Sequence, residues 1–222
     1  MTLTDDMVAF VVTATPPEAA LTLAVDHLDA MGAALRRDGE AVAAAHPGGS
    51  PTAMNRAWRT ALDALRVDTA GWPVIVATVL ALQQDSPTEL KAADALAVGT
   101  AVAEWVADAL TAATVAERWS ARGFAGLIGA GVAAARLLDL DEAGVRNVVG
   151  LCATQAAGLR AAEGSEAGVV QAAKAAADAV EAATLARHGF TSAADGLGGR
   201  RGLFALLAPG ATPQPDFIWT RT

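Results

Sequence analysis

The chain has no tyrosine, and aromatic residues make up only 5% of its 222 residues. A core built mainly from aromatic side chains is therefore excluded. Hydrophobic residues still account for 53% of the chain, with alanine and glycine prominent among the small ones. Alanine is the strongest helix former, and small side chains let helix backbones approach closely. The composition favours closely packed helices, in a chain long enough to bury a sizeable core.

Basic residues, histidine and cysteine are also scarce. The chain has 16 Lys and Arg against 24 Asp and Glu, for a net charge of -8. We expect no nucleic-acid partner, because basic patches supply most of the affinity for nucleic acid. A single cysteine, Cys152, excludes an internal disulfide and suits a reducing cytoplasm. The three histidines have no partners at metal-ligand spacing, so no metal is expected.

Signals for membrane insertion or export are missing as well. The N-terminus, "MTLTDDMVAF", is acidic and lacks the basic region of a signal peptide. The most apolar uninterrupted run, Val74 to Leu82, is too short to cross a bilayer. These features predict a cytoplasmic protein without a membrane partner.

Most of the chain carries apolar residues at helical spacing, and no stretch shows the sustained alternation of a strand. Thr15 precedes two prolines, and Ser86 precedes Glu89 by three residues, both of which are helix-start patterns. The expected helices cover about 16–35, 52–67, 73–84, 87–110, 125–138, 141–159, 169–187 and 200–207. We predict one all-α domain over 1–209, followed by an extended tail over 210–222.

One stretch, "GLIGAGVAAARLLDLD", resembles a dinucleotide-binding turn, because Gly129, Gly131 and Ala134 fit G-x-G-x-x-A. Such a turn must follow a strand, and an acidic residue must end the next strand about twenty residues later. Here the acids Asp139 and Asp141 come too early, and no strand is expected. We interpret the stretch as a small-residue helix and expect no cofactor. An oxidoreductase is therefore the least favoured of the three functions that we consider.

Longer segments carry a family resemblance. The run "RGFAGLIGAGVAAARLLDLDEAGVRNVVGLCATQAAGL" resembles the helical domain of the MmgE/PrpD family, which includes 2-methylcitrate dehydratase and cis-aconitate decarboxylase. The following "GSEAGVVQAAKAAADAVEAATLARHGFTSAADGLGGRRGLFALLAP" is similar to the family's next segment, and "LDAMGAAL" to an early helix. The resemblance implies a compact helical domain and a homodimer. It covers only the first part of that domain, so we expect the family's smaller α/β domain to be missing.

The resemblance places Asp63 at the family's catalytic aspartate. Trp72 stands where the family has an active-site His, and Phe124 is followed directly by Ala125, where the family inserts His-Pro-Thr. Gly168 and Gln171 match a family Lys and His. Ordinary dehydration of methylcitrate or decarboxylation of aconitate is therefore not expected.

Six residues remain as site candidates. Asp63 is a potential general acid or base if burial raises its pKa, although a solvated helix acid is equally compatible with the sequence. Glu166, near the lost Lys, is a second catalytic candidate, although loop acids are commonly solvated. Substrate contacts are assigned to Trp72, Arg122, Phe124 and Gln171. Trp72 is alternatively a core residue and Arg122 a structural one.

Two functions fit this pattern. The first is a repurposed lyase, isomerase or cyclase of specialised metabolism that acts on a hydrophobic small molecule, because apolar residues replace the polar catalytic set. The second is a non-catalytic helical scaffold or regulatory partner of a full-length relative, because the catalytic His and Lys residues are absent.

Overall fold

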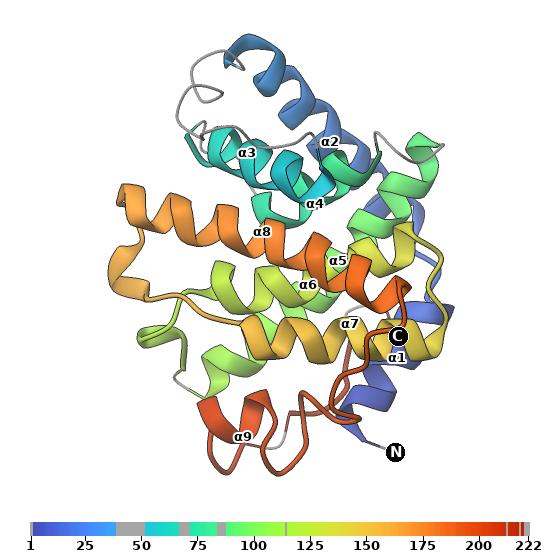
Figure 1. Ribbon diagram of the computed structural model, residues 1–222, viewed down its shortest axis with the longest axis vertical. Coiled ribbons are helices and arrows are strands. Elements are labelled where there is room, and N and C mark those ends of the chain that lie inside the picture. The colour runs from blue at the N-terminus through green and yellow to red at the C-terminus, as the bar shows by residue number, and fades with distance from the viewer. Residues whose placement is uncertain are drawn as a thin grey trace.

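The computed structural model describes residues 2–38, 52–66, 72–83, 88–113, 115–211, 213–217 and 219. The described residues form nine α-helices (Figure 1) and no strand apart from one isolated bridge between Trp119 and Leu159. The helices are α1 (Leu3–Thr13), α2 (Glu18–Asp38), α3 (Ala53–Arg66), α4 (Pro73–Gln83), α5 (Glu89–Ala112), α6 (Ala121–Leu137), α7 (Glu142–Gln155), α8 (Glu166–Arg187) and α9 (Leu203–Leu207). Two short 3-10 helices are η1 (Val115–Glu117) and η2 (Arg160–Ala162). The predicted all-α fold is confirmed.

The first helix, α1, was not among the expected elements. Its start is a capping box, in which the Thr2 side chain accepts from the Asp5 amide and the Asp5 carboxylate accepts from the Thr2 amide. Arg146 of α7 also binds Asp5, at 2.7 Å. These hydrogen bonds hold the pKa of Asp5 below its ordinary value. The Thr-x-x-Asp spacing was a readable helix-start signal that the sequence analysis passed over.

Several helix starts differ from the expected positions. Thr88 caps α5 by accepting from the Lys91 amide, whereas Ser86 lies outside the described residues. The carbonyl of Pro17, and not Thr15, receives the first amides of α2. Helix α6 begins at Ala121, four residues before the expected start. Helix ends commonly differ by a residue or more between a sequence pattern and a structure, and at α5 two capping residues, Ser86 and Thr88, stand close together in the sequence.

Helix α6 is the centre of the fold. Every residue is buried except Ala121, Arg122 and Arg136. Helices α4, α5, α7 and α8 all pack against it. In Figure 1, α2, α3 and α4 cover one side of the domain and α9 lies at the opposite side. A helix enclosed on all sides needs small residues, because its neighbours must all lie close to one axis.

A close helix contact joins α5 and α6 at two glycines. A Cβ atom at Gly129 would lie 2.5 Å from the carbonyl oxygen of Gly99, and one at Gly99 would lie 2.6 Å from that of Gly129. Both distances are below van der Waals contact, and the opposing atoms belong to backbone that cannot move aside. Only glycine at both positions allows this approach.

The G-x-G-x-x-A stretch lies inside α6, so its glycines do not form a phosphate-binding turn. Gly129 faces α5, and a Cβ at Gly131 would lie 2.5 Å from the Cys152 sulfur of α7. Gly126 faces Trp72 and Val74 at the start of α4, with the nearest atoms 3.5 Å from an added Cβ. The interpretation of this stretch as a close-packing helix is therefore correct.

The outward-facing end of α6 is fixed by Arg136. Its guanidinium binds both carboxylate oxygens of Asp94 on α5, at 2.6 and 3.0 Å. It also donates to the carbonyls of Val11 and Ala14, at 2.6 and 2.8 Å. Those carbonyls belong to the C-terminal turn of α1, where backbone acceptors lack helical partners. One side chain thus holds α1, α5 and α6 together.

One described helix is long and apolar enough to span a membrane by length and composition, namely α5. It is longer than the most apolar uninterrupted run of the sequence, which forms α4. Within the fold, 61% of the most apolar window of α5 is buried. Burial of this kind is typical of the core helix of a soluble domain.

The described residues after Pro209 follow an extended path across α1 and α5. Phe217 is 2% exposed and stacks on Phe10 of α1, with ring centroids 4.4 Å apart. Trp105 of α5 contacts the same ring and donates its indole N–H to the Gln214 carbonyl at 2.7 Å. Trp105 also meets Phe204 of α9 edge to face. The C-terminal segment therefore supports the position of α9.

Replacing Gly129 with alanine tests the contact between α5 and α6. We expect Gly129→Ala to lower the free energy of unfolding by about 1–3 kcal/mol, because the added methyl group overlaps backbone. Gly126→Ala is the matched control in the same helix. Its methyl group meets only ordinary contacts, so stability should stay unchanged or rise by up to about 1 kcal/mol through helix propensity. Urea unfolding measures both, and equal effects would contradict the close contact.

Candidate functional site

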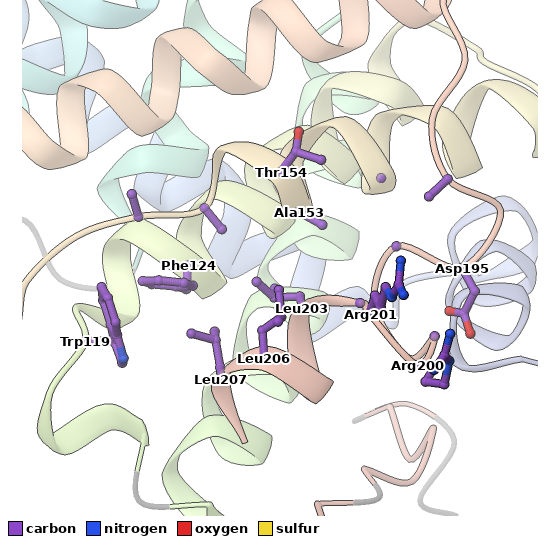
Figure 2. Close-up of a pocket in the computed structure, with 17 residues that line it drawn as sticks. Trp119, Phe124, Ala153, Thr154, Asp195, Arg200, Arg201, Leu203, Leu206 and Leu207 are labelled. Atoms are coloured by element: carbon purple, nitrogen blue, oxygen red, sulfur yellow. The ribbon is translucent and has the colours of Figure 1, made fainter. Parts of the chain in front are cut away.

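A cavity of about 740 Å³ opens between α6, α7, α9 and the loop that precedes α9. We call it the Trp119–Leu207 cavity. Figure 2 shows its lining residues. They are Trp119, Phe124, Gly150, Ala153, Thr154, Ala156, Ala157, Ala193, Asp195, Gly196, Gly199, Arg200, Arg201, Gly202, Leu203, Leu206 and Leu207. Apolar side chains thus form most of the wall, and the volume is typical of a small-molecule site.

The aromatic wall comes from the segment that enters α6. Phe124 is 2% exposed, and its ring meets that of Trp119 edge to face, with centroids 5.4 Å apart. A Cβ at Gly123 would lie 1.9 Å from the carbonyl oxygen of Ala157. Glycine at this position lets the start of α6 lie directly against the strand-like segment that follows α7. That contact brings the aromatic pair and the Ala156–Ala157 backbone to one wall.

Gln171 of α8 holds the adjoining loop. Its side-chain oxygen accepts from the Leu159 amide at 2.7 Å, and its side-chain nitrogen donates to the Leu159 carbonyl at 3.3 Å. Leu159 in turn forms the isolated bridge with Trp119. The amide of Gln171 therefore has both ends engaged with backbone and fixes the loop behind the aromatic wall.

The opposite wall comes from α9 and the loop before it. Figure 2 places Leu203, Leu206 and Leu207 between the aromatic pair and the polar end of the cavity. The loop is tied at its base, because Leu203 and Phe204 donate to the carbonyls of residues 196 and 197 at 2.9 and 3.1 Å. The short helix thus projects from an anchored turn.

Charged groups gather at one end of the cavity. Arg200 and Arg201 line it with exposed side chains, and neither forms an ion pair among the described residues. Asp195 is the one lining carboxylate. Its Oδ1 accepts from the Thr4 hydroxyl at 2.6 Å and from the Gly198 amide at 2.9 Å. The aspartate therefore anchors the loop to α1.

The structure places one of the six candidates in this cavity, namely Phe124. Gln171 stands behind its wall. Arg122 and Glu166 are exposed and do not line it. Trp72 is half-buried against Gly126 on another side of α6. The candidates are thus spread over several faces, and their assigned roles stay predictions.

Asp63, the principal acid-base candidate, lies in α3, and its side chain lies outside the described part of the structure. Within that part, no group of three His, Cys, Asp or Glu residues is arranged to hold a metal ion. What the described geometry provides is an apolar enclosure with a cationic end. The chemistry of such a site suits an amphipathic molecule.

The arginine pair is not among the site residues predicted from the sequence. The stretch "GRRGLF" contributes only to the family resemblance and to the expected helix over 200–207. Two adjacent arginines within a glycine-rich turn, in a chain with so few basic residues, were the available signal. The partners across the cavity lie some eighty residues earlier, so the spacing itself carried no information.

Cys152 lies directly beside the cavity wall but does not enter it. Its side chain is fully buried against Gly131. Burial raises the pKa of its thiol well above the ordinary value, and the nearby Asp178 carboxylate adds to this shift. A thiol of this kind stays protonated and is not a nucleophile. Cys152 is therefore a small core residue.

Comparison with known proteins gives one family match. The family model described as the MmgE/PrpD N-terminal domain matches residues 57–216. The matched span includes α4 to α9 and every residue that lines the Trp119–Leu207 cavity. No curated protein matches the chain.

The burial of Cys152 is tested with a thiol reagent. We expect no reaction of the native protein with dithionitrobenzoate at pH 8, because the thiol is buried and remains protonated. One equivalent should react once the protein is unfolded in guanidinium chloride, which serves as the control. Rapid modification of the folded protein would contradict the buried position.

Proposed function

The chain belongs to the MmgE/PrpD family through its N-terminal domain, and from this premise we propose that it is an enzyme acting on a hydrophobic small molecule in the Trp119–Leu207 cavity. The single observation that carries the proposal is the cavity itself. Its wall includes residues of the two segments that resemble the family's "R-G-F" and "R-R-G-F" elements.

The composition of the wall supports a hydrophobic substrate. Two aromatic rings and three leucines face a volume of about 740 Å³, while the charged side chains lie at one end. Transfer of apolar surface from water into such an enclosure contributes about 25 cal/mol per Å². A polar tricarboxylate would gain little from these walls, so the substrate differs from those of the named family members.

The reaction class that we propose is a lyase, isomerase or cyclase reaction. An enclosure with few polar groups accelerates a reaction chiefly by holding the substrate in a reactive conformation, with one group transferring a proton. Asp63 matches the family's catalytic aspartate, but its helix α3 does not line this cavity. An acid-base role for Asp63 would therefore belong to a reaction outside the cavity. We place the enzyme in specialised metabolism, in the cytoplasm and as a homodimer.

A second function is favoured by a different observation. Glu166 and Arg122 are exposed, and both ends of the Gln171 amide are engaged with Leu159. These polar candidates therefore do not face a common substrate. A non-catalytic helical scaffold, or a regulatory partner of a full-length relative, needs no such convergence.

Binding in the cavity is tested with the neutral dye Nile red and a substitution that fills the space. Ala157 is an exposed lining residue, so Ala157→Trp should block the cavity without disturbing the core. We expect the wild-type protein to bind the dye with a blue-shifted emission, and Ala157→Trp to weaken binding at least about tenfold. Ala167→Trp, at an exposed alanine outside the cavity, is the matched control and should bind normally. Equal binding by all three would place the dye elsewhere and count against the site.

Catalysis is tested by incubating the protein with a small-molecule extract and comparing it with heat-denatured protein by mass spectrometry and chromatography. An enzyme of the proposed class should consume one compound, either with loss of water or carbon dioxide or with a change of retention at constant mass. Asp63→Asn tests the family-derived assignment: turnover should fall at least about a hundredfold if Asp63 transfers the proton, and should stay unchanged if the reaction takes place in the cavity without it. Asp29→Asn, at an exposed acid of α2, should leave turnover unchanged. A complete absence of consumption would favour the non-catalytic function.

A further inference from the structure

The geometry points to a more specific ligand for the Trp119–Leu207 cavity, an inference that rests on the proposed function. We propose that the cavity takes a hydrophobic monocarboxylic acid, whose carboxylate binds Arg200 and Arg201 and whose apolar body lies against Trp119, Phe124 and α9. The argument combines charge, anchoring of the loop and the separation of the two ends of the cavity.

The charged side chains at the polar end of the cavity sum to one net positive charge. Arg200 and Arg201 supply two cations, and Asp195 supplies one anion. The Asp195 carboxylate is already held by Thr4 and Gly198. One net positive charge suits a singly charged carboxylate better than a phosphate dianion. A positively charged cavity end also contrasts with the net charge of the chain, which is -8.

The loop that carries the arginines is held in place before any ligand arrives. Besides the Asp195 contacts, Gly202 donates to the Gly199 carbonyl at 2.7 Å and closes a turn around both arginines. Leu197, within the same loop, is completely buried. Because the backbone is already fixed, less conformational entropy is lost when a ligand binds and orders the two guanidinium groups.

The two ends of the cavity are separated in space. Figure 2 shows Arg200 and Arg201 beside Asp195, with Trp119 and Phe124 at the far end and the α9 leucines between them. Arginine presents a planar set of donors that matches a carboxylate, often through two parallel hydrogen bonds. An amphipathic acid therefore satisfies both ends at once, whereas a purely apolar compound leaves the cationic end without a partner.

The test compares three ten-carbon ligands, decanoate, 1-decanol and decylammonium, by isothermal titration calorimetry at pH 7. We expect decanoate to bind about tenfold more tightly than decanol. The reason is that its carboxylate forms charge-assisted hydrogen bonds with the exposed arginines, which decanol cannot form. Decylammonium should bind more weakly than decanol. Added salt should reduce the affinity for decanoate but not that for decanol, because only the former involves charges.

Substitution of the arginines removes the preference while keeping the apolar site. The double variant Arg200→Gln and Arg201→Gln should bind decanoate and decanol equally, with the decanol affinity close to that of wild type. Arg187→Gln is the matched control, at an exposed arginine at the end of α8 that does not line the cavity. It should retain the wild-type preference.

The outcomes separate this inference from the proposed function. Binding of decanol without any preference for decanoate in the wild-type protein would overturn the carboxylate site and leave the apolar cavity intact. Binding of neither ligand would overturn both. The wild-type comparison needs no variant, so it decides the question even if the double variant folds poorly.

Discussion

The contact between Gly99 and Gly129 sets the spacing on which the rest of the structure depends. It brings the backbones of α5 and α6 closer than any residue with a Cβ allows. Helices α4, α7 and α8 pack against the other sides of α6. As a result, α6 is buried along almost its whole length. Large aromatic cores achieve stability through a few bulky side chains. Here the burial is spread over many small side chains and close backbones instead.

This spacing also explains where a cavity can form. The middle of α6 is buried among α4, α5, α7 and α8, whereas at its N-terminal end the neighbours include loops and the short helix α9. Trp119 and Phe124 form one wall there, and α9 is positioned by the contact of Phe204 with Trp105, which also meets Phe217 of the C-terminal segment. The cavity thus lies where tight helix packing ends, between elements whose positions are fixed from outside it.

The family relationship and the site chemistry lead to different expectations. Membership of the MmgE/PrpD family accounts for the helical fold, while the resemblance noted in the sequence pairs Trp72, Gly168 and Gln171 with the family's His and Lys residues. In the structure, the amide of Gln171 holds the Leu159 backbone. An apolar cavity with a cationic end is compatible with the fold but calls for a different ligand, because function resides in the site and not in the fold.

Much of the architecture was predictable from local chemistry. The apolar periodicity of α2 and α3, the Asp141 cap of α7 and the absence of alternating segments all act over a few residues, so the helical class and the small-residue character of α6 followed directly. Helix α1 was predictable in principle from its capping box. The family resemblance, carried by segments between Arg122 and Pro209, was likewise present in the residues themselves.

The site could not be predicted from local sequence patterns. Arg200 and Arg201 meet Trp119 and Phe124 only because the chain turns back after α8, and no spacing rule relates residues eighty positions apart. The exposure of individual side chains could not be predicted either. Glu166 and Phe124 both lie near helix starts, yet Glu166 is exposed and Phe124 is buried. The sequence by itself determined a family, a helical fold and a close-packed centre, because these depend on local periodicity and side-chain size. Only the tertiary structure decided which side chains share a cavity, because that depends on how the helices pack.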